Sequence, residues 1–246
     1  MKTRHLTLAL AALTITPEAL AQSHVHVSIE RTFGFVYNRV TESSETTMGS
    51  TTVTRESTAE WNSLNLLGSG VTGAVPGLGT YPWSNLLPRL AVDYELDSHL
   101  TLGGALFLTW SSLASNGTTG STFGFGIAPR VGYMLHLSDR LSFWPRGGMT
   151  LGYFSASPDV GPTGVGVTVS QSTRYVPLWV NIEPTLVINI ERHFAFTVGI
   201  IGDLPLTGGA TTETTTTTGS TTVTRTVDSK LTQLIIAAQV GVMGTF

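Results

Sequence analysis

The 246-residue sequence contains no cysteine and few charged residues, and both absences narrow its class. Without cysteine, the chain has neither a disulfide scaffold nor a thiol-anchored lipid. Charged residues make up 12% of the chain, which is about half the share usual in soluble domains. After the first 21 residues, no stretch reaches the roughly 18 apolar residues of a membrane helix. This composition, with abundant threonine and 27 glycines, favours β-structure that is apolar on one face.

The amino terminus has the three parts of a secretory signal. Residues 1–5 are short and basic, residues 6–16 are apolar, and Ala19–Ala21 forms a small-x-small cleavage site. The apolar part is too short to span a bilayer, and Pro17 argues against a buried helix. We expect cleavage after Ala21 and export through the inner membrane, which leaves residues 22–246 as one domain.

The carboxy-terminal run Leu234–Phe246 alternates between apolar and mixed positions. Its even-numbered positions are apolar almost throughout, whereas Gln239 and Thr245 lie on the other face. In an exported chain, an apolar face of this length points to lipid rather than to a soluble core. Similar alternation recurs upstream, and we predict eight strands at 24–38, 86–96, 100–112, 122–137, 141–156, 173–190, 194–206 and 229–246.

Short turns separate some of these strands and long connections separate the others. The short turns lie at 97–99, 138–140 and 191–193, and the longest connections are 39–85 and 207–228. This arrangement predicts an all-β fold, a closed antiparallel up-and-down transmembrane β-barrel with its short turns in the periplasm. The competing fold is a soluble, lipocalin-like barrel with apolar residues inside and charges outside.

Aromatic residues are expected at the two interfacial depths of the lipid face. The aromatic residues near the short turns are Tyr94, Tyr133, Phe143, Phe194 and Phe246. Those near the other rim are Tyr37, Trp110, Phe123 and Tyr153.

Two features depart from the alternation. Arg31 falls on the apolar face of the first strand, which either a β-bulge or a snorkelling side chain would explain. Prolines also occur within the strands, where each removes a ladder hydrogen bond, and we interpret them as markers of bulges. They are Pro88, Pro129, Pro145, Pro177 and Pro184, of which four fall on the lipid-facing register.

Seven charged residues occupy inward positions of the predicted barrel, five of them at about one height and Asp93 and Asp203 one or two rungs away. They are Glu30, Arg89, Asp93, Arg130, Arg146, Glu183 and Asp203. Side chains fill an eight-stranded barrel, so charges buried there must pair. Inward Phe107, Trp144, Phe154 and Trp179 face inward glycines, which favours a plug over a pore. We predict a structural salt-bridge layer, with a gated polar path or a substrate site as the alternative.

The heptapeptide GSTTVTR occurs twice, at Gly49–Arg55 and Gly219–Arg225. Because the first and last strands must be neighbours in a closed barrel, the two connections that hold these copies would emerge side by side. Threonine favours extended structure, so the copies would continue the barrel wall outward as a protruding sheet. An adhesive edge is a further hypothesis, and shared low-complexity drift is the alternative.

The histidines of the mature chain all fall at or near the predicted periplasmic end. They are His24, His26, His99, His136 and His193. A Ser–His pair at the outer rim, which a lipid-modifying enzyme would need, is therefore excluded. No histidine–carboxylate cluster at metal spacing and no phosphate-binding loop is visible. We predict no enzymatic activity, no catalytic residue, no metal and no cofactor. A net charge of −3 without a basic tract argues against nucleic acid.

The chain from residue 22 onward resembles small eight-stranded outer-membrane β-barrels of the OmpA/OmpX type. The site at Ala19–Ala21, the alternating strands, the Arg/Glu interior and the terminal Phe246 carry this resemblance. It implies a monomeric integral barrel in contact with outer-membrane lipid and lipopolysaccharide, with Phe246 as part of the signal that the barrel-assembly machinery reads. A structural or surface-interaction role is the leading hypothesis. A narrow channel or carrier for small, hydrophobic solutes is the alternative.

Overall fold

The computed structural model describes residues 24–48, 51–66, 74–75, 79–80, 87–115, 118–160 and 167–246, and the regular structure in them is entirely β. The strands are β1 (His24–Met48), β2 (Thr51–Leu66), β3 (Ala74–Val75), β4 (Gly79–Thr80), β5 (Arg89–Glu95), β6 (Leu100–Ser115), β7 (Thr118–Tyr133), β8 (Leu135–Ser138), β9 (Leu141–Val160), β10 (Val167–Glu191), β11 (Phe194–Thr218) and β12 (Thr221–Thr245). Within these residues, no helix is long and apolar enough to cross a membrane. The signal predicted at 1–21 lies outside the described residues.

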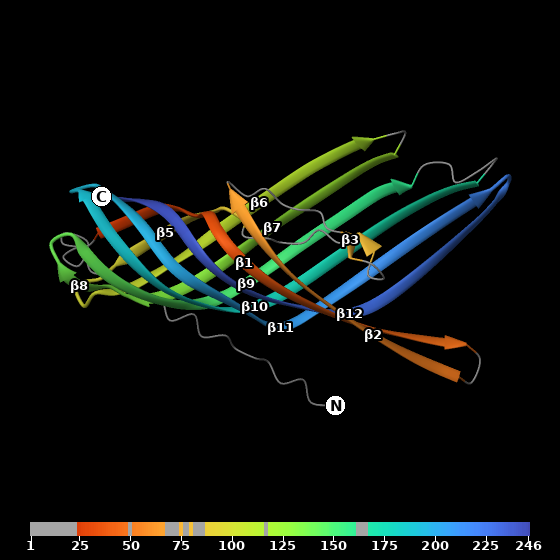
Figure 1. The fold of residues 1–246 in the computed structure, drawn as a ribbon, viewed down its shortest axis with the longest axis horizontal. Coiled ribbons are helices and arrows are strands. Elements are labelled where there is room, and N and C mark those ends of the chain that lie inside the picture. Colours follow the sequence, from red (N-terminus) through yellow and green to blue (C-terminus); the bar gives the residue numbers. More distant parts are fainter. Residues whose placement is uncertain are drawn as a thin grey trace, which may run out of the picture.

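Eight of these strands close into a ring. Their order is β1–β5–β6–β7–β9–β10–β11–β12, and β12 pairs back with β1 (Figure 1). All of these pairs are antiparallel. At the seam, Val25 and Phe246 exchange backbone hydrogen bonds with N···O distances of 3.0 and 2.9 Å. The prediction of a closed, antiparallel, eight-stranded barrel is confirmed.

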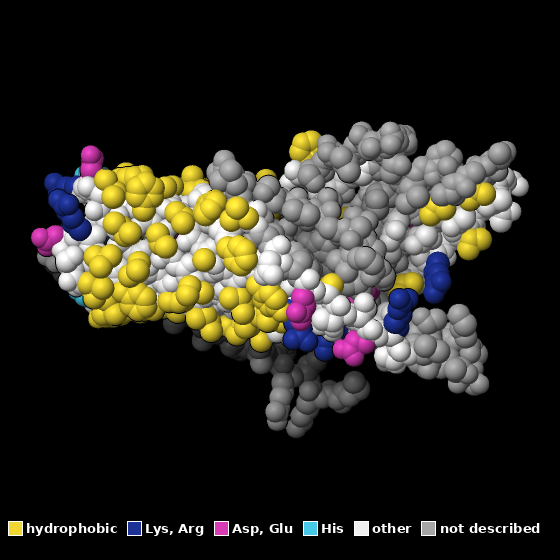
Figure 2. Space-filling model, viewed as in Figure 1, with side chains coloured by type: hydrophobic (Ala, Val, Ile, Leu, Met, Phe, Trp, Pro, Cys, Tyr) yellow, Lys and Arg dark blue, Asp and Glu magenta, His cyan; other side chains and the backbone are white. Residues whose placement is uncertain are grey.

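Apolar side chains cover the outside of the ring and polar side chains fill much of the inside. On β12, Ile236 is 46% exposed, whereas Gln233 and Gln239 are at most 2% exposed. Figure 2 shows the apolar side chains gathered over the half of the barrel that carries the short turns. An apolar exterior around a polar interior suits lipid as the surrounding solvent, and it contradicts the soluble, lipocalin-like alternative.

The aromatic residues predicted for the lipid face are on the outside of the barrel. At the short-turn end, Tyr133 and Phe194 are 42% and 41% exposed, and toward the other rim Trp110 and Phe123 are 72% and 39% exposed.

The predicted long loops 39–85 and 207–228 are largely strand, so those boundaries were wrong. β1 continues to Met48 and β2 returns beside it, while β11 and β12 form a hairpin that turns at Gly219, whose φ is 58°. Beyond the apolar band both faces of these strands carry polar side chains, so the alternation used to recognise strands disappears there. The predicted strand 122–137 is also interrupted, at Met134, and the strand predicted at 86–96 is shortened to β5.

Three of the five prolines do not mark bulges, whereas Pro177 lies one residue from a register shift between β10 and β11. Pro88, Pro129, Pro145 and Pro184 lie on the outward register as predicted. However, the β7–β9 and β9–β10 registers run past Pro129, Pro145 and Pro184 without a shift, and Pro145 lies directly opposite Pro184. Each of these three prolines therefore costs the ladder a hydrogen bond without adding an extra residue to its strand.

Large aromatic side chains pack across the lumen on the far side of the buried charges from the short turns. We call this group, made of Phe107, Phe154, Tyr175 and Trp179, the aromatic layer. The rings of Phe107 and Phe154 stack with their centroids 5.7 Å apart. Glycines on the neighbouring strand β7 make room for the rings, since a Cβ atom at Gly126 would overlap Phe107.

We expect Gly126→Ala to destabilise the barrel by about 1–3 kcal/mol, the usual cost of overpacking. Besides the Phe107 ring, the added Cβ would come within 2.7 Å of the Leu151 carbonyl oxygen. Urea unfolding in detergent micelles, followed by tryptophan fluorescence, measures the change. Gly202→Ala is the matched control, because a Cβ there meets nothing within 4 Å. Equal unfolding midpoints for the two variants would contradict tight packing in the aromatic layer.

Candidate functional site

Eight buried charges form one layer across the lumen. All seven inward charges predicted from the sequence belong to it, and Arg31 is the eighth. The members of this charge layer are Glu30, Arg31, Arg89, Asp93, Arg130, Arg146, Glu183 and Asp203, and none of their side chains is more than 6% exposed. Four arginines face four carboxylates, so the layer is formally neutral.

A β-bulge brings Arg31 into the lumen. Ile29 lies opposite Val242 and Phe33 lies opposite Val240, so three residues of β1 occupy the place of one residue of β12. Arg31 adopts a φ of 58°, and both it and Glu30 are buried. The bulge, rather than snorkelling, therefore explains why Arg31 departs from the alternation.

The charge layer is a continuous chain of ion pairs. Arg130 and Arg146 donate to Glu30 with N···O distances of 2.6 and 2.5 Å. Arg31 donates to Glu183 and to Asp203, both at 2.7 Å. The order along the chain is Asp93, Arg130, Glu30, Arg146, Glu183, Arg31, Asp203 and Arg89, the last pair being 3.7 Å apart. Removing an inner member breaks the chain and takes one ion-pair partner from each of its neighbours.

Aromatic rings cover both sides of the charge layer and leave little free space. The guanidinium of Arg146 lies 4.3 Å from the Trp144 ring centroid, and that of Arg89 lies 5.7 Å from the Phe107 ring centroid. Two cavities beside the charges have volumes of about 10 Å³ each, which is about the space one water molecule needs. The predicted charges thus lie paired with one another, and among the described residues the two cavities beside them are each about the size of one water molecule.

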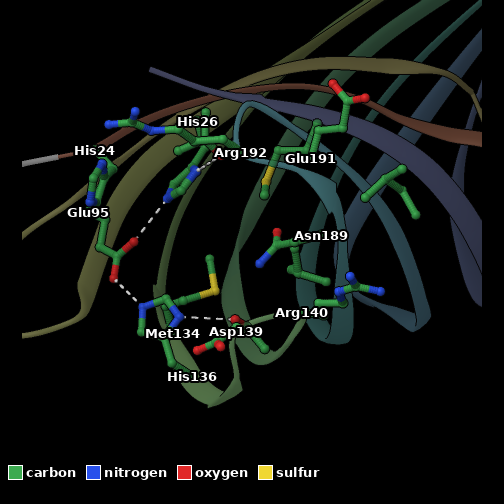
Figure 3. Close-up of a pocket in the computed structure, with 15 residues that line it drawn as sticks. His24, His26, Glu95, Met134, His136, Asp139, Arg140, Asn189, Glu191 and Arg192 are labelled. Carbon is green, nitrogen blue, oxygen red and sulfur yellow. Dashed lines mark hydrogen bonds and ion pairs between the residues drawn. The ribbon is translucent and has the colours of Figure 1, made fainter.

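A larger cavity opens at the short-turn end of the barrel, and we call it the mouth cavity (Figure 3). Its volume is about 480 Å³, and its lining includes His24, His26, Glu95 and His136. The imidazole of His26 lies 5.8 Å from the Trp144 ring between centroids, so Trp144 separates this cavity from the charge layer.

Glu95, the last residue of β5, is the centre of a histidine cluster at the mouth cavity. Its Oε1 lies 3.1 Å from Nδ1 of His99 and 3.2 Å from Nε2 of His136. Its Oε2 lies 3.0 Å from Nε2 of His26. The carboxylate is buried, whereas the side chains of His99 and His136 are 50% and 49% exposed. Figure 3 shows Glu95, His26 and His136 directed toward one another.

In two of these imidazoles, the ring nitrogen that does not contact Glu95 lies within hydrogen-bonding distance of a hydroxyl group. His136 Nδ1 lies 3.0 Å from the Ser142 hydroxyl, and His26 Nδ1 lies 3.1 Å from the Thr245 hydroxyl. Ser142 is only 1% exposed, so its hydroxyl serves to orient His136.

Sequence reasoning placed the histidines at this end correctly but missed the cluster. The expectation that the chain has no histidine–carboxylate cluster at metal spacing was wrong, because Glu95, His99 and His136 form one. The missing step was topological. Neighbouring hairpins of an up-and-down barrel place their turns side by side, and the pairing of Leu100 with Tyr133 brings His99 next to β8. Residues 37 positions apart in the sequence therefore share one carboxylate.

No protein-family model matches this sequence, and no curated protein matches it significantly. Among solved structures, the attachment invasion locus protein Ail of Yersinia pestis has a TM-score of 0.40 and 11% identity, over 91% of this chain and 98% of that chain. The outer-membrane protease OmpT of Escherichia coli has a TM-score of 0.33 and 9% identity, over 91% and 97%. The toluene transporter TodX of P. putida has a TM-score of 0.22 and 6% identity, over 91% and 90%. At such scores, the fold assignment rests on the strand pairings described above.

The prediction that this chain is not an enzyme was wrong, because the sequence does not exclude enzymatic activity. OmpT, one of the outer-membrane proteins to which this chain is similar, is a protease. The absence of histidines from the outer rim does not extend to the mouth cavity, where two histidines do meet a carboxylate. Neither activity nor its absence follows from the likeness.

Proposed function

We propose that this small eight-stranded outer-membrane β-barrel is a closed scaffold that acts at the cell surface through its long outer hairpins. The observation that carries the proposal is the length of those hairpins. β1, β10, β11 and β12 each run for 25 residues, more than twice the 9–11 or so needed to cross a bilayer. Figure 1 displays them continuing well past the end of the ring.

The closed lumen argues against transport as the role of this barrel. A solute moving along the axis would have to part the charge layer and the aromatic layer, and the cavities beside the charges hold about 10 Å³ each. Separating buried ion pairs costs several kcal/mol per charge, so a path through the lumen is unfavourable. The alternative of a narrow channel or carrier therefore has less support than the surface role.

The outer hairpins offer open strand edges. β1 and β12 pair only as far as Ser44 and Ser229. Beyond that point, within the described strands, β12 pairs only with β11 and β1 only with β2. The β1–β2 and β11–β12 hairpins diverge in Figure 1, so the described residues of the GSTTVTR copies, 51–55 and 219–225, extend the wall apart from each other. Open edges of this kind accept an added strand, so an extended polypeptide is the partner chemistry that fits them.

Threonine side chains strengthen the β11–β12 hairpin where it stands in water. The hydroxyls of Thr215 and Thr224 lie 3.2 Å apart, and so do those of Thr217 and Thr222. Cross-strand threonine pairs stabilise a sheet that has no core beneath it. A stiff hairpin loses less conformational entropy on binding than a disordered loop, which favours recognition.

The proposal also includes the position of the barrel in the membrane. We place the apolar exterior in contact with outer-membrane lipid and lipopolysaccharide, the short turns in the periplasm and the long hairpins outside. Export by a cleaved signal at residues 1–21, a monomeric state and insertion by the barrel-assembly machinery complete the proposal.

Shortening the β11–β12 hairpin tests the surface role. Thr214 and Arg225 are a cross-strand pair, so residues 215–224 can be replaced by a two-residue Asn-Gly turn without changing the register below. We expect attachment of bacteria that carry this variant to a cultured cell monolayer to fall on the order of tenfold, equivalent to about 1.4 kcal/mol of lost contact.

The matched control shortens the β6–β7 hairpin in the same way. Leu113 and Gly120 are a cross-strand pair, and an Asn-Gly turn can replace residues 114–119. Both variants should still show the gel shift on heating that is typical of intact barrels. The surface role is contradicted if the two variants attach as well as the original protein.

A further inference from the structure

We propose that Glu95, His99 and His136 bind a divalent transition-metal ion at the mouth cavity, with Zn²⁺ and Cu²⁺ as the best fits. This site is independent of the surface role proposed above, because it lies at the opposite end of the barrel. One oxygen and two nitrogens, one from each residue, lie within 4.8 Å of one another.

The spacing of the donor atoms suits a metal. Glu95 Oε1 is 3.1 Å from His99 Nδ1 and 3.2 Å from His136 Nε2. Around tetrahedral zinc, with bonds of about 2.0–2.1 Å, ligand atoms lie about 3.3 Å apart. Small side-chain rotations therefore admit an ion between the three atoms. The two imidazoles are half exposed, so they have freedom to make that adjustment.

Neighbouring groups already orient the ligands as metal sites require. A ligating histidine usually donates its other ring N–H to a fixed acceptor, and His136 Nδ1 has the Ser142 hydroxyl at 3.0 Å. A ligating carboxylate is usually held through its second oxygen, and Glu95 Oε2 has His26 Nε2 at 3.0 Å. In turn, Thr245 fixes His26 at 3.1 Å.

The backbone holds His99 in an uncommon conformation that aims its ring at Glu95. Its φ is 64°, in the left-handed region that few residues other than glycine adopt. Two hydrogen bonds of 2.8 Å fix this turn, one from His99 N to the Leu96 carbonyl and one from Met134 N to the His99 carbonyl. Such conformations persist where the surroundings impose them, often at ligand sites.

The donor set selects the class of ion. Imidazole nitrogen suits zinc and copper, whereas calcium and magnesium prefer sites made entirely of oxygen. Three protein ligands leave at least one position for water, and the ion would face the mouth cavity of about 480 Å³. The bound ion would join the turn after β5 to β8, and so fasten two adjacent hairpins at the short-turn end.

Calorimetric titration of the untagged, full chain in detergent with zinc chloride at neutral pH tests the site. We expect one ion per chain, with affinity that falls on acidification because protons compete for the imidazoles. His99→Gln and His136→Gln should each weaken binding by more than the roughly 10–100-fold that loss of a residue supporting a ligand costs. His193→Gln is the matched control, since His193 lies at the same rim but bonds the Thr245 carbonyl instead. It should leave the affinity unchanged.

The Cu²⁺-loaded original chain gives a second readout that does not depend on a variant that folds. Its electron paramagnetic resonance spectrum should show hyperfine coupling to two imidazole nitrogens. The proposal is overturned if zinc binding does not saturate, or if the His99→Gln and His136→Gln variants bind zinc as tightly as the original chain. A copper spectrum without nitrogen coupling would also overturn it.

Discussion

Arg130→Met should reduce the free energy of unfolding by about 3–5 kcal/mol, the usual cost of leaving buried charges without their partner. Arg130 is the only described ion-pair partner of Asp93 and one of two that bind Glu30. Methionine fills much of the same volume, so the loss comes from electrostatics rather than from a cavity. Urea unfolding in detergent and the temperature of the gel shift both measure it.

Two further variants separate this explanation from a general sensitivity to mutation. Arg174→Met replaces an exposed arginine of β10 and should change stability by less than about 0.5 kcal/mol. Adding Asp93→Asn to Arg130→Met removes the stranded carboxylate and should recover part of the loss. If the double variant is no more stable than Arg130→Met alone, the uncompensated charge is not the cause.

In the proposed insertion by the barrel-assembly machinery the terminal strand is recognised by strand addition, so Phe246→Ala should lower the amount of assembled barrel in cells on the order of tenfold. The same variant should refold in detergent nearly as well as the original chain. Its backbone bonds with Val25 remain, and the ring it loses is 72% exposed. Quantitative blotting of the membrane fraction measures assembly, and the gel shift on heating measures refolding.

Phe194→Ala provides the comparison for Phe246→Ala. Phe194 is an outward-facing aromatic residue at the same rim, 41% exposed, on the strand next to β12. It should leave cellular assembly almost unchanged. Comparable losses in the two variants would mean that the aromatic rim as a whole, and not Phe246, is recognised.

Where the chain crosses lipid, the sequence predicts the structure well. Lipid on one side and a filled lumen on the other impose a period of two, and that period is visible in β12, where Ile236 and Gln239 lie on opposite faces. Counting positions along the strands placed five of the charges at one height and Asp93 and Asp203 within two rungs of them, and the structure joins all seven in one layer. The zero net charge of that layer could not be predicted, however, because Arg31 enters the lumen through a bulge.

The parts that the sequence did not predict lack that two-sided constraint. Beyond the lipid, threonine-rich strands have water on both faces, so strands such as Thr51–Leu66 had the composition of a loop. The histidine cluster was missed in the sequence for another reason. His99 and His136 reach Glu95 because two turns lie next to each other in space, and no local pattern records that distance.

With the long hairpins outside the cell, as proposed, the length of β12 also determines which part of the protein an approaching particle contacts first. At about 3.3 Å per residue, its 25 residues span about 80 Å. With a tilt of about 40° the strand rises roughly 60 Å, against an apolar band of about 25 Å. The difference is about the diameter of a small domain. An antibody or a bacteriophage would thus touch threonine well before it reached hydrocarbon, and the tip is free to diverge in sequence without disturbing the cylinder beneath it.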